Sequence, residues 1–332
     1  MNSVGRLDYI DIAKGIGISL VVLGHTTITI SGGIGKFVHD FLYLFHMPLF
    51  FLISGYLYNH KREQTLWSYS KRKLYSLAIP FLFFWIVPSL YQIFVNGEPY
   101  SYLYRWIFLE QFDCWAIWFL YSLLIVSVLY KAFYESIQKV SVWWVLLGGL
   151  ILFTSFKLHF KALLDTTAFC LIYYYIGNQC RIRKLAVKKS AIGIVCVFLL
   201  IFAKNYRDYR TFIYVNYRGF WFGNNDFVST IVFALLGSLM VIWISQYFAC
   251  YKIPSRMFSY LGRNSIIVVC THVQIMQMVQ KQFPNMNWLG EFLLVIVLYY
   301  CGLIFIGRKY LPFIFGMRNN AKRQTDTAGK VA

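Results

Sequence analysis

The stretch "YIDIAKGIGISLVVLGHTTI" (residues 9–28) is long and apolar enough to cross a bilayer, yet it contains charged and ionisable side chains. A helix needs roughly 20 apolar residues to cross the hydrocarbon core. Asp11, Lys14 and His25 interrupt this one. Ionisable groups at membrane depth are costly and are commonly retained for function. The stretch therefore predicts a membrane-spanning helix that also contributes to a functional site.

The spacing of these side chains adds to that interpretation. Lys14 and His25 are eleven residues apart, about three helical turns, so they share a face and are separated by roughly 16 Å along the axis. Asp11 precedes Lys14 by three residues and can pair with it. Alternatively, Lys14 extends to the interface and His25 bonds a neighbouring helix. Two ionisable groups on one face, at a spacing that suits a long ligand, favour function.

The composition of the whole chain indicates an all-α polytopic membrane protein. Of its 332 residues, 59% are hydrophobic, 20% aromatic and only 14% charged, and the mean hydropathy is +0.56. A chain this apolar does not fold around one soluble core. The net charge of +19 would suit a nucleic-acid partner, but the lysines and arginines form short clusters between apolar stretches. Such clusters are typical of cytoplasmic loops, so no nucleic acid is expected.

Hydropathy and length predict about ten transmembrane spans in a single helical bundle. The expected spans are 10–30, 41–58, 75–95, 115–131, 142–157, 161–178, 190–204, 227–248, 264–282 and 289–307. We expect residues 1–312 to form one transmembrane domain and 313–332 to be a disordered cytoplasmic tail. With the N-terminus in the cytoplasm, the inner loops and tail contain 22 of the 32 lysines and arginines. That bias predicts that both chain ends are cytoplasmic.

Three further features limit the possible chemistry. The seven cysteines have no CxxC or metal-like spacing, so we expect unpaired packing residues and no metal site. The first apolar segment lacks a small-residue cleavage site and is expected to be retained. The largest outer loop, 205–226, is rich in Tyr, Phe, Trp, Arg and Asn. Its rings can anchor the chain at the interface or stack on a sugar.

Other segments contain polar or aromatic residues where plain spans would not need them. These residues are His46 beside Pro48, then Lys71, Arg72 and Lys73 before the third span, Trp115 and Trp118 at the start of the fourth, and Arg263, Asn264 and His272 at the start of the ninth. Each alone has an ordinary structural explanation. Their presence together in one chain points to a shared site.

Five stretches carry a family resemblance. They are "DYIDIAKGIGISLVVLGH", "FHMPLFFLISGYL", "KRKLYSLAIPF", "WAIWFLYSLL" and "YLGRNSIIVVCTH", in order from the first span to the ninth. Together they resemble the membrane-bound acyltransferase 3 family, and within it the fucose 4-O-acetylase-like branch. Each motif is weak alone, but the ordered set covers most of the chain.

The resemblance implies a bacterial inner-membrane protein of about ten spans. Such proteins transfer an acyl group, usually acetyl from cytosolic acetyl-CoA, to cell-surface carbohydrate, and no bound cofactor is implied. The family's first span has an arginine, ten residues and a histidine. His25 matches that histidine, while Lys14 replaces the arginine and loses its bidentate fork. The family's basic motif before the third span matches Lys71, Arg72 and Lys73 only loosely.

These correspondences lead to an expected mechanism. Lys71, Arg72 and Lys73 would hold the phosphates of acyl-CoA at the cytoplasmic face. Lys14 would lie at the mouth of a channel, and His25 would act as general base on the acceptor hydroxyl. An acyl-histidine intermediate is the less favoured route.

Supporting roles are expected for several of the remaining residues. His46 or His272 would transfer a second proton or orient the acceptor. Asp11, Trp115, Trp118, Arg263 and Asn264 would support the site or the acceptor.

Two other classes stay open at this point. An exporter of polysaccharide or its precursor could use the same intramembrane groups as a proton relay. The sequence, however, shows no clear inverted repeat with paired broken helices. A structural subunit of a glycan-assembly complex would keep its function after a His25→Ala substitution.

Overall fold

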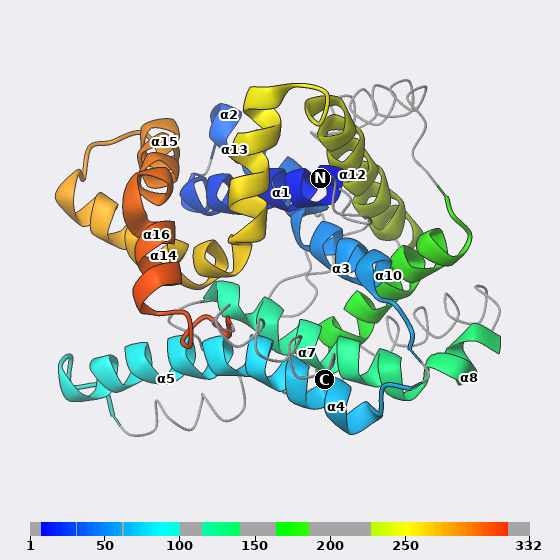
Figure 1. Cartoon of the computed structure of the whole chain (residues 1–332). Helices are drawn as coiled ribbons and strands as arrows, with labels where there is room; N and C mark the ends of the chain where they lie inside the picture. The colour runs from blue at the N-terminus through cyan, green and yellow to red at the C-terminus, as the bar shows by residue number, and fades with distance from the viewer. Residues whose placement is uncertain are drawn as a thin grey trace.

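Figure 1 shows the computed structural model of the chain. It describes residues 8–30, 32–61, 63–99, 115–139, 164–185 and 227–317. Every regular element within these ranges is helical. The all-α expectation is therefore confirmed for the described residues.

The described helices follow one another along the chain. They are α1 (Asp8–Thr26), α2 (Gly33–Tyr43), α3 (His46–Leu57), α4 (Leu66–Lys73), α5 (Ile79–Phe94), α7 (Trp118–Ala132), α8 (Tyr134–Lys139), α10 (Leu164–Ile182), α12 (Phe227–Phe248), α13 (Lys252–Arg263), α14 (Ser265–Gln282), α15 (Trp288–Leu298) and α16 (Ile304–Tyr310). A 3₁₀ turn covers Trp115–Ile117, and π turns cover Leu74–Ala78 and Tyr299–Leu303. The connections from α5 to α7, α8 to α10 and α10 to α12 include residues outside the described ranges.

Four of the described helices are long and apolar enough to cross a membrane: Gly33–Leu57, Leu66–Phe94, Ile231–Phe248 and Trp288–Tyr310. They correspond to the expected second, third, eighth and tenth spans. α1, α7, α10 and α14 lie at the expected first, fourth, sixth and ninth. The expected spans 142–157 and 190–204, and the loop 205–226, fall outside the described residues. A membrane protein is thus supported, while the count of ten and the orientation of the ends stay predictions.

Two helix boundaries differ from expectation. The segment expected as one span at 41–58 is divided, because α2 ends at Tyr43 and α3 begins at His46. Pro48 lies in the first turn of α3, where its missing N–H has no intrahelical partner to lose, so it starts a helix and does not disturb one. The cations Lys71–Lys73 form the last turn of α4, which continues through a π turn into α5. They therefore belong to a continuous helix and do not precede it.

Glycines allow two helix pairs to pack with their backbones in contact. A Cβ at Gly15 of α1 would lie 1.9 Å from the carbonyl oxygen of Phe258 in α13. A Cβ at Gly262 of α13 would lie 1.8 Å from the carbonyl oxygen of Asp11. Because any side chain at these positions would collide with backbone, the glycines fix how closely α1 and α13 approach.

The same arrangement joins α3 to α10. A Cβ at Gly55 would lie 1.9 Å from the carbonyl oxygen of Tyr174, and one at Gly177 would lie 2.0 Å from that of Leu52. Asn178 then donates to the carbonyl of Tyr58 at 3.1 Å, so a polar contact adds to the close packing.

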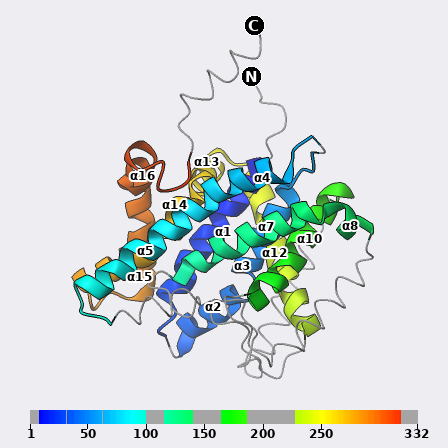
Figure 2. The ribbon, with the colours of Figure 1, turned by 90° about the horizontal axis from the view of Figure 1, so that it is seen from below.

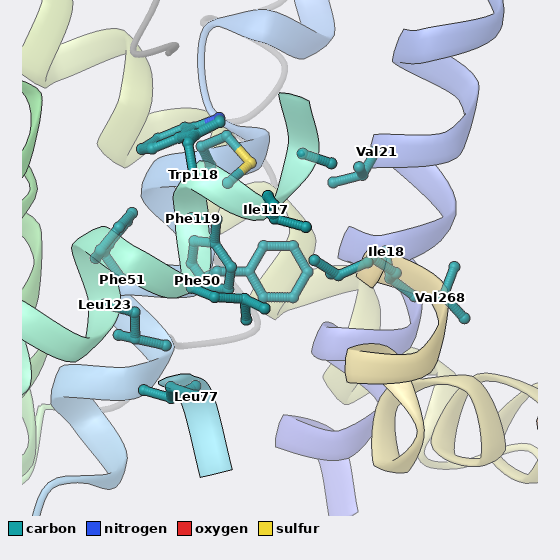
Figure 3. Packing of buried hydrophobic residues seen from close by; sticks show 14 of the residues in the cluster. Ile18, Val21, Phe50, Phe51, Leu77, Ile117, Trp118, Phe119, Leu123 and Val268 are labelled. Atoms are coloured by element: carbon teal, nitrogen blue, oxygen red, sulfur yellow. The ribbon is translucent and has the colours of Figure 1, made fainter. Parts of the chain in front are cut away.

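Buried apolar side chains from α1, α3, α7 and α14 fill the space between these pairs (Figure 3). In this view Ile18 of α1 lies between Val268 of α14 and the rings of Phe50 in α3 and Phe119 in α7, and all four belong to one buried cluster. The Phe50 and Phe119 rings have centroids 5.6 Å apart. This core packs α1 and α14 together, which matters for the site below.

The described chain continues past the expected domain boundary at 312. Phe315 is 3% exposed, and its ring centroid lies 5.5 Å from that of Phe84 in α5. Residues 313–317 therefore pack on the bundle, and the remainder of the expected tail lies outside the described residues. Among the described cysteines, Cys180, Cys250 and Cys301 are free, as expected.

Figure 2 shows that α4, α13 and α16 gather at one end of the bundle and that α2 lies toward the opposite end. The end of the bundle where α4, α13 and α16 gather is called the α13 end below. The last turns of α4, α13 and α16 all contain basic residues.

Candidate functional site

At the α13 end, one buried carboxylate joins two helices. Asp11 is 4% exposed, and its Oδ1 lies 2.8 Å from Lys14 Nζ. Its Oδ2 accepts from Arg263 Nε at 3.3 Å. The expected Asp11–Lys14 pair is present. Arg263, however, is the last residue of α13 and not the start of a helix, because the chain turns at Asn264 before α14 begins.

Beside this junction lies a cleft of about 410 Å³, called the basic cleft below. Its lining residues come from the start of α1, the region of α12 to α14, and α16: Asp8, Ala249, Lys252, Ser255, Arg256, Ser259, Tyr260, Arg263, Asn264 and Arg308. Four are cations and one is a carboxylate. Of the residues expected in the site, Arg263 and Asn264 are here. Lys252, Arg256 and Arg308 had appeared in the sequence only as loop or tail charges.

Asn264 has a structural part in this wall. It is 2% exposed, and its side-chain amide donates to the carbonyl of Tyr260 at 2.7 Å. This bond holds the turn between α13 and α14, which places the start of α14 at the cleft.

Farther along the same helices, two histidines from distant parts of the chain meet. His25 lies in the last turn of α1, and His272 lies in α14. Their ring centroids are 4.9 Å apart, with an interplanar angle of 61°. His272 is fully buried and His25 is partly exposed. The structure thus brings together two residues that the sequence indicated separately.

Tyr43, at the end of α2, links this pair to two more histidines. Its ring centroid is 6.3 Å from that of His25 and 4.7 Å from that of His46. On another side it stacks on His39 at 4.0 Å. His25, His39, His46 and His272, together with Tyr43, form what is called the histidine cluster below.

His39, Tyr43 and the neighbouring Asp40 were not among the residues expected in the site. Asp40 is 4% exposed, and it interacts with His39 Nδ1 at 3.2 Å and with the ammonium of Lys36. A signal for them exists in the sequence, because His39, Tyr43 and His46 are spaced four and three residues apart, as on one helical face. Asp40 also provides a carboxylate near the cluster, which Asp11 is too distant to do.

The hydrogen bonds of two histidines fix which ring nitrogen carries hydrogen. His272 Nδ1 lies 2.8 Å from the carbonyl oxygen of Val268 and 3.1 Å from that of Val269. His46 Nδ1 lies 2.7 Å from the carbonyl oxygen of Leu42. Because a carbonyl only accepts, each Nδ1 is the donor, and each neutral ring keeps its lone pair on Nε2. His272 Nε2 is buried and has no hydrogen-bond partner among the residues that the structure describes.

The tryptophans and the α4 cations lie elsewhere. Trp118 is 4% exposed and stacks on Phe51 at 6.4 Å, so it packs in the core between α3 and α7. For Trp115 the structure describes only the backbone, in the 3₁₀ turn before α7. Arg72 and Lys73 lie over the ring of Tyr69 at 5.5 and 5.7 Å. The α4 cations are not among the residues that line the basic cleft.

The helical bundle, its apolar helices and its internal histidine cluster define a class, a helical membrane protein with ionisable groups placed for chemistry. A family model described as an acyltransferase domain, that of the acyltransferase 3 family, matches residues 7–307. The match covers nearly the whole chain, so the protein belongs to this family and is a membrane acyltransferase. No curated protein and no solved structure matches the chain.

Proposed function

We propose that the protein transfers an acyl group, acetyl in the simplest case, from cytosolic acyl-CoA to a hydroxyl of a surface or secreted carbohydrate. The family match supports acyl transfer. The observation that carries the proposal is that the rings of His25 and His272 meet within the bundle, with their centroids 4.9 Å apart. The bacterial inner membrane and the fucose 4-O-acetylase-like branch follow from the sequence resemblance and belong to the same proposal.

In this proposal the nucleotide of acyl-CoA lies at the α13 end of the bundle, and the base, His25, lies deeper in it. The residues from Asp11 to His25 cover roughly 21 Å of α1, and those from Ser265, at the start of α14, to His272 cover roughly 10 Å. Both paths lead from cations at the α13 end to the histidine cluster. A charged nucleotide would stay at the α13 end, because it cannot enter hydrocarbon. The thin pantetheine arm would carry the thioester inward to His25.

The chemical step requires a base, for which His25 is proposed. It removes the proton of the acceptor hydroxyl as the oxygen bonds to the thioester carbonyl. The C–S bond then breaks, and the departing CoA thiolate takes the proton from the imidazolium. Hydroxyl and acyl-CoA thus become ester and free CoA, with no other reactant.

His272 is proposed as the positioning residue for His25. Its Nδ1 is held by the backbone and its Nε2 has a lone pair, so it can accept from the N–H of His25. The other nitrogen of His25 would then be the one that takes the hydroxyl proton. His46, fixed in the same tautomer, is the second candidate for orienting the acceptor.

The remaining roles expected from the sequence are also proposed, with fewer structural contacts to support them. Lys71, Arg72 and Lys73, expected from the sequence to hold the CoA phosphates, lie in α4 at the α13 end (Figure 2) and are the alternative to the cations of the basic cleft. Lys14 would lie at the mouth of the path to His25. The aromatic loop 205–226, on which an outer-facing sugar site was expected, lies outside the described residues, so the acceptor side rests on sequence alone.

The proposal is tested by measuring whether a radiolabelled acetyl group moves from acetyl-CoA to a glycan. Purified protein in nanodiscs is incubated with radiolabelled acetyl-CoA and a crude surface-glycan extract, with empty nanodiscs as the control. We expect label in the glycan only with protein present, and that fraction then identifies the acceptor. Absence of transfer, with protein-dependent proton or glycan flux in proteoliposomes, would instead favour the transporter.

A further inference from the structure

We propose that the basic cleft is the binding site for the phosphate groups of the donor nucleotide. The ligand follows from the proposed function, which requires an acyl-CoA at the α13 end. The location follows from the cleft itself. Lys252, Arg256 and Arg308 are the cations that the sequence had not singled out.

The balance of charge in the cleft calls for an anion. Across the described part of the chain, no ion pair involves Lys252, Arg256 or Arg308. Arg263 shares Asp11 with Lys14, and Asp8 is the one carboxylate among the residues that line the cleft. Like charges gathered in one concave space repel each other and focus a positive potential. A ligand with several phosphates would offset that repulsion, and each contact would be a charge-assisted hydrogen bond.

Neutral groups in the wall suit the same ligand. The hydroxyls of Ser255 and Ser259 are donors of the kind that bind phosphate oxygens. The ring of Tyr260 stacks on that of Tyr300 at 5.9 Å, and Tyr300 is fixed by a bond to the carbonyl of Met257 at 2.8 Å. An aromatic ring is therefore held in the wall of the cleft, where a nucleobase can stack.

The cleft also has the right position relative to the histidine cluster. Asn264 in its wall precedes His272 by eight residues of α14, which is roughly 12 Å along the axis. An extended pantetheine arm covers that distance. A nucleotide in the cleft therefore leaves its thioester within reach of His25 and His272.

The α4 cations fit this ligand less well. Arg72 and Lys73 lie over Tyr69, and Lys71 is exposed on the helix surface. Basic residues in such places commonly interact with anionic lipid at the membrane surface. A lipid headgroup offers phosphate too, and the exposed Ile253 and Met257 of α13 would lie near lipid. The experiment must therefore separate nucleotide from lipid.

The test measures binding and needs no turnover. Full-length protein in phosphatidylcholine nanodiscs is titrated calorimetrically with CoA and with adenosine 3′,5′-bisphosphate. Arg256→Gln/Arg308→Gln is compared with the wild type and with Arg72→Gln/Lys73→Gln, which removes the same charge at the same end. We expect the cleft variant to bind both probes at least about tenfold more weakly, since two charge-assisted contacts are lost. The α4 variant should stay within about twofold of the wild type.

Each result decides the proposal. Equal weakening in both variants, weakening only in the α4 variant, or no CoA binding by the wild type would overturn it. A second arm uses nanodiscs that contain phosphatidylglycerol. The cleft binds lipid, and the proposal is wrong, if two results are obtained together. The anionic lipid raises Tm for the wild type but not for the cleft variant, and the two proteins bind CoA equally well. Selective loss of CoA binding in a protein that transfers no acyl group would keep the cleft assignment and overturn the proposed function.

Discussion

His272 is the residue whose chemistry is most constrained by its surroundings. Two backbone carbonyls hold its Nδ1, and its ring centroid lies 4.9 Å from that of His25. The arrangement corresponds to the orienting partner that general-base histidines commonly have.

Replacing His272 separates packing from hydrogen bonding. We expect His272→Leu to lower kcat about 10²-fold with little change in the KM for acetyl-CoA, because the base is misoriented while donor binding is intact. His272→Gln offers an amide that can accept at a similar place and should recover part of the rate. The pH dependence of kcat in each variant is the second readout, since it reports the base in the loaded enzyme. Equal rates for the Leu and Gln variants would show that hydrogen bonding at this position does not matter.

Asp11 has a different kind of role, which is to compensate charge. Asp11→Asn leaves Lys14 and Arg263 without their shared carboxylate, and we expect it to destabilise the fold by about 1–2 kcal/mol. The estimate is below that for a fully buried pair because the two cations are 24% and 46% exposed. Thermal unfolding in detergent measures it. Asp8→Asn, an exposed change in the same helical turn, is the control, and equal Tm values for the two variants would contradict the role.

Residue types alone could predict part of the site. Three of the four clustered histidines and the Asp11–Lys14 pair were indicated because each lies in an apolar segment where a charge or imidazole needs an explanation. His39 and Asp40 were missed because they precede the expected second span, 41–58, and resemble loop residues. Tyr43 lies within that span and was missed because a tyrosine in an apolar run needs no special explanation. The meeting of His25 with His272 could not be predicted, because it depends on how α1 and α14 pack.

At the scale of elements, the α1–α13 pair determines the geometry of the site. At one end of this pair, Asp11 of α1 accepts a hydrogen bond from Arg263 of α13. From there α1 continues to His25 in its last turn. The approach is set by Gly15 and Gly262, whose absent side chains let backbones touch. The partner of Gly15 could not be predicted from the sequence, because it depends on how the helices pack.

A methyl group at Gly15 should therefore break this pair. Gly15→Ala places a Cβ 1.9 Å from the carbonyl oxygen of Phe258, so the helices must separate. We expect a loss of about 2–3 kcal/mol of stability or a failure to fold, measured by Tm and by yield in detergent. Gly302→Ala, where the added Cβ meets no atom within 4 Å, is the matched control and should leave Tm unchanged or slightly higher. A Gly15→Ala protein as stable as that control would contradict the close packing.

Helix boundaries were the less predictable part of the elements. Apolar runs located the described spans because hydrophobic length alone is enough for that. The break between α2 and α3 and the continuity of Leu66–Phe94 were not predicted, because turn and π-helical geometry leave weak signals in an apolar sequence.

At the scale of the whole molecule, the remaining question is which side of the membrane the α13 end faces. The bias of basic residues predicts the cytoplasm. Cys250 lies exposed between α12 and α13, so its accessibility to a labelling reagent shows which side of the membrane the α13 end faces. A membrane-impermeant maleimide should label it in inverted vesicles and not in right-side-out ones, with the labelled peptide identified by mass spectrometry and Cys250→Ser as the control. Labelling of Cys250 from the outer side would reverse the orientation and remove cytosolic CoA from the basic cleft.

Family membership gives acyl transfer as the general activity, and we propose the histidine cluster as its location. The most direct test is a single-turnover measurement of acetyl transfer from labelled acetyl-CoA to the purified acceptor fraction. His25→Ala is compared with His60→Ala, a change to a histidine that stacks on Tyr134 at 4.0 Å, outside the cluster. We predict that His25→Ala abolishes transfer with wild-type Tm and CoA binding, while His60→Ala transfers normally. Full transfer by His25→Ala would contradict the account and place the base elsewhere.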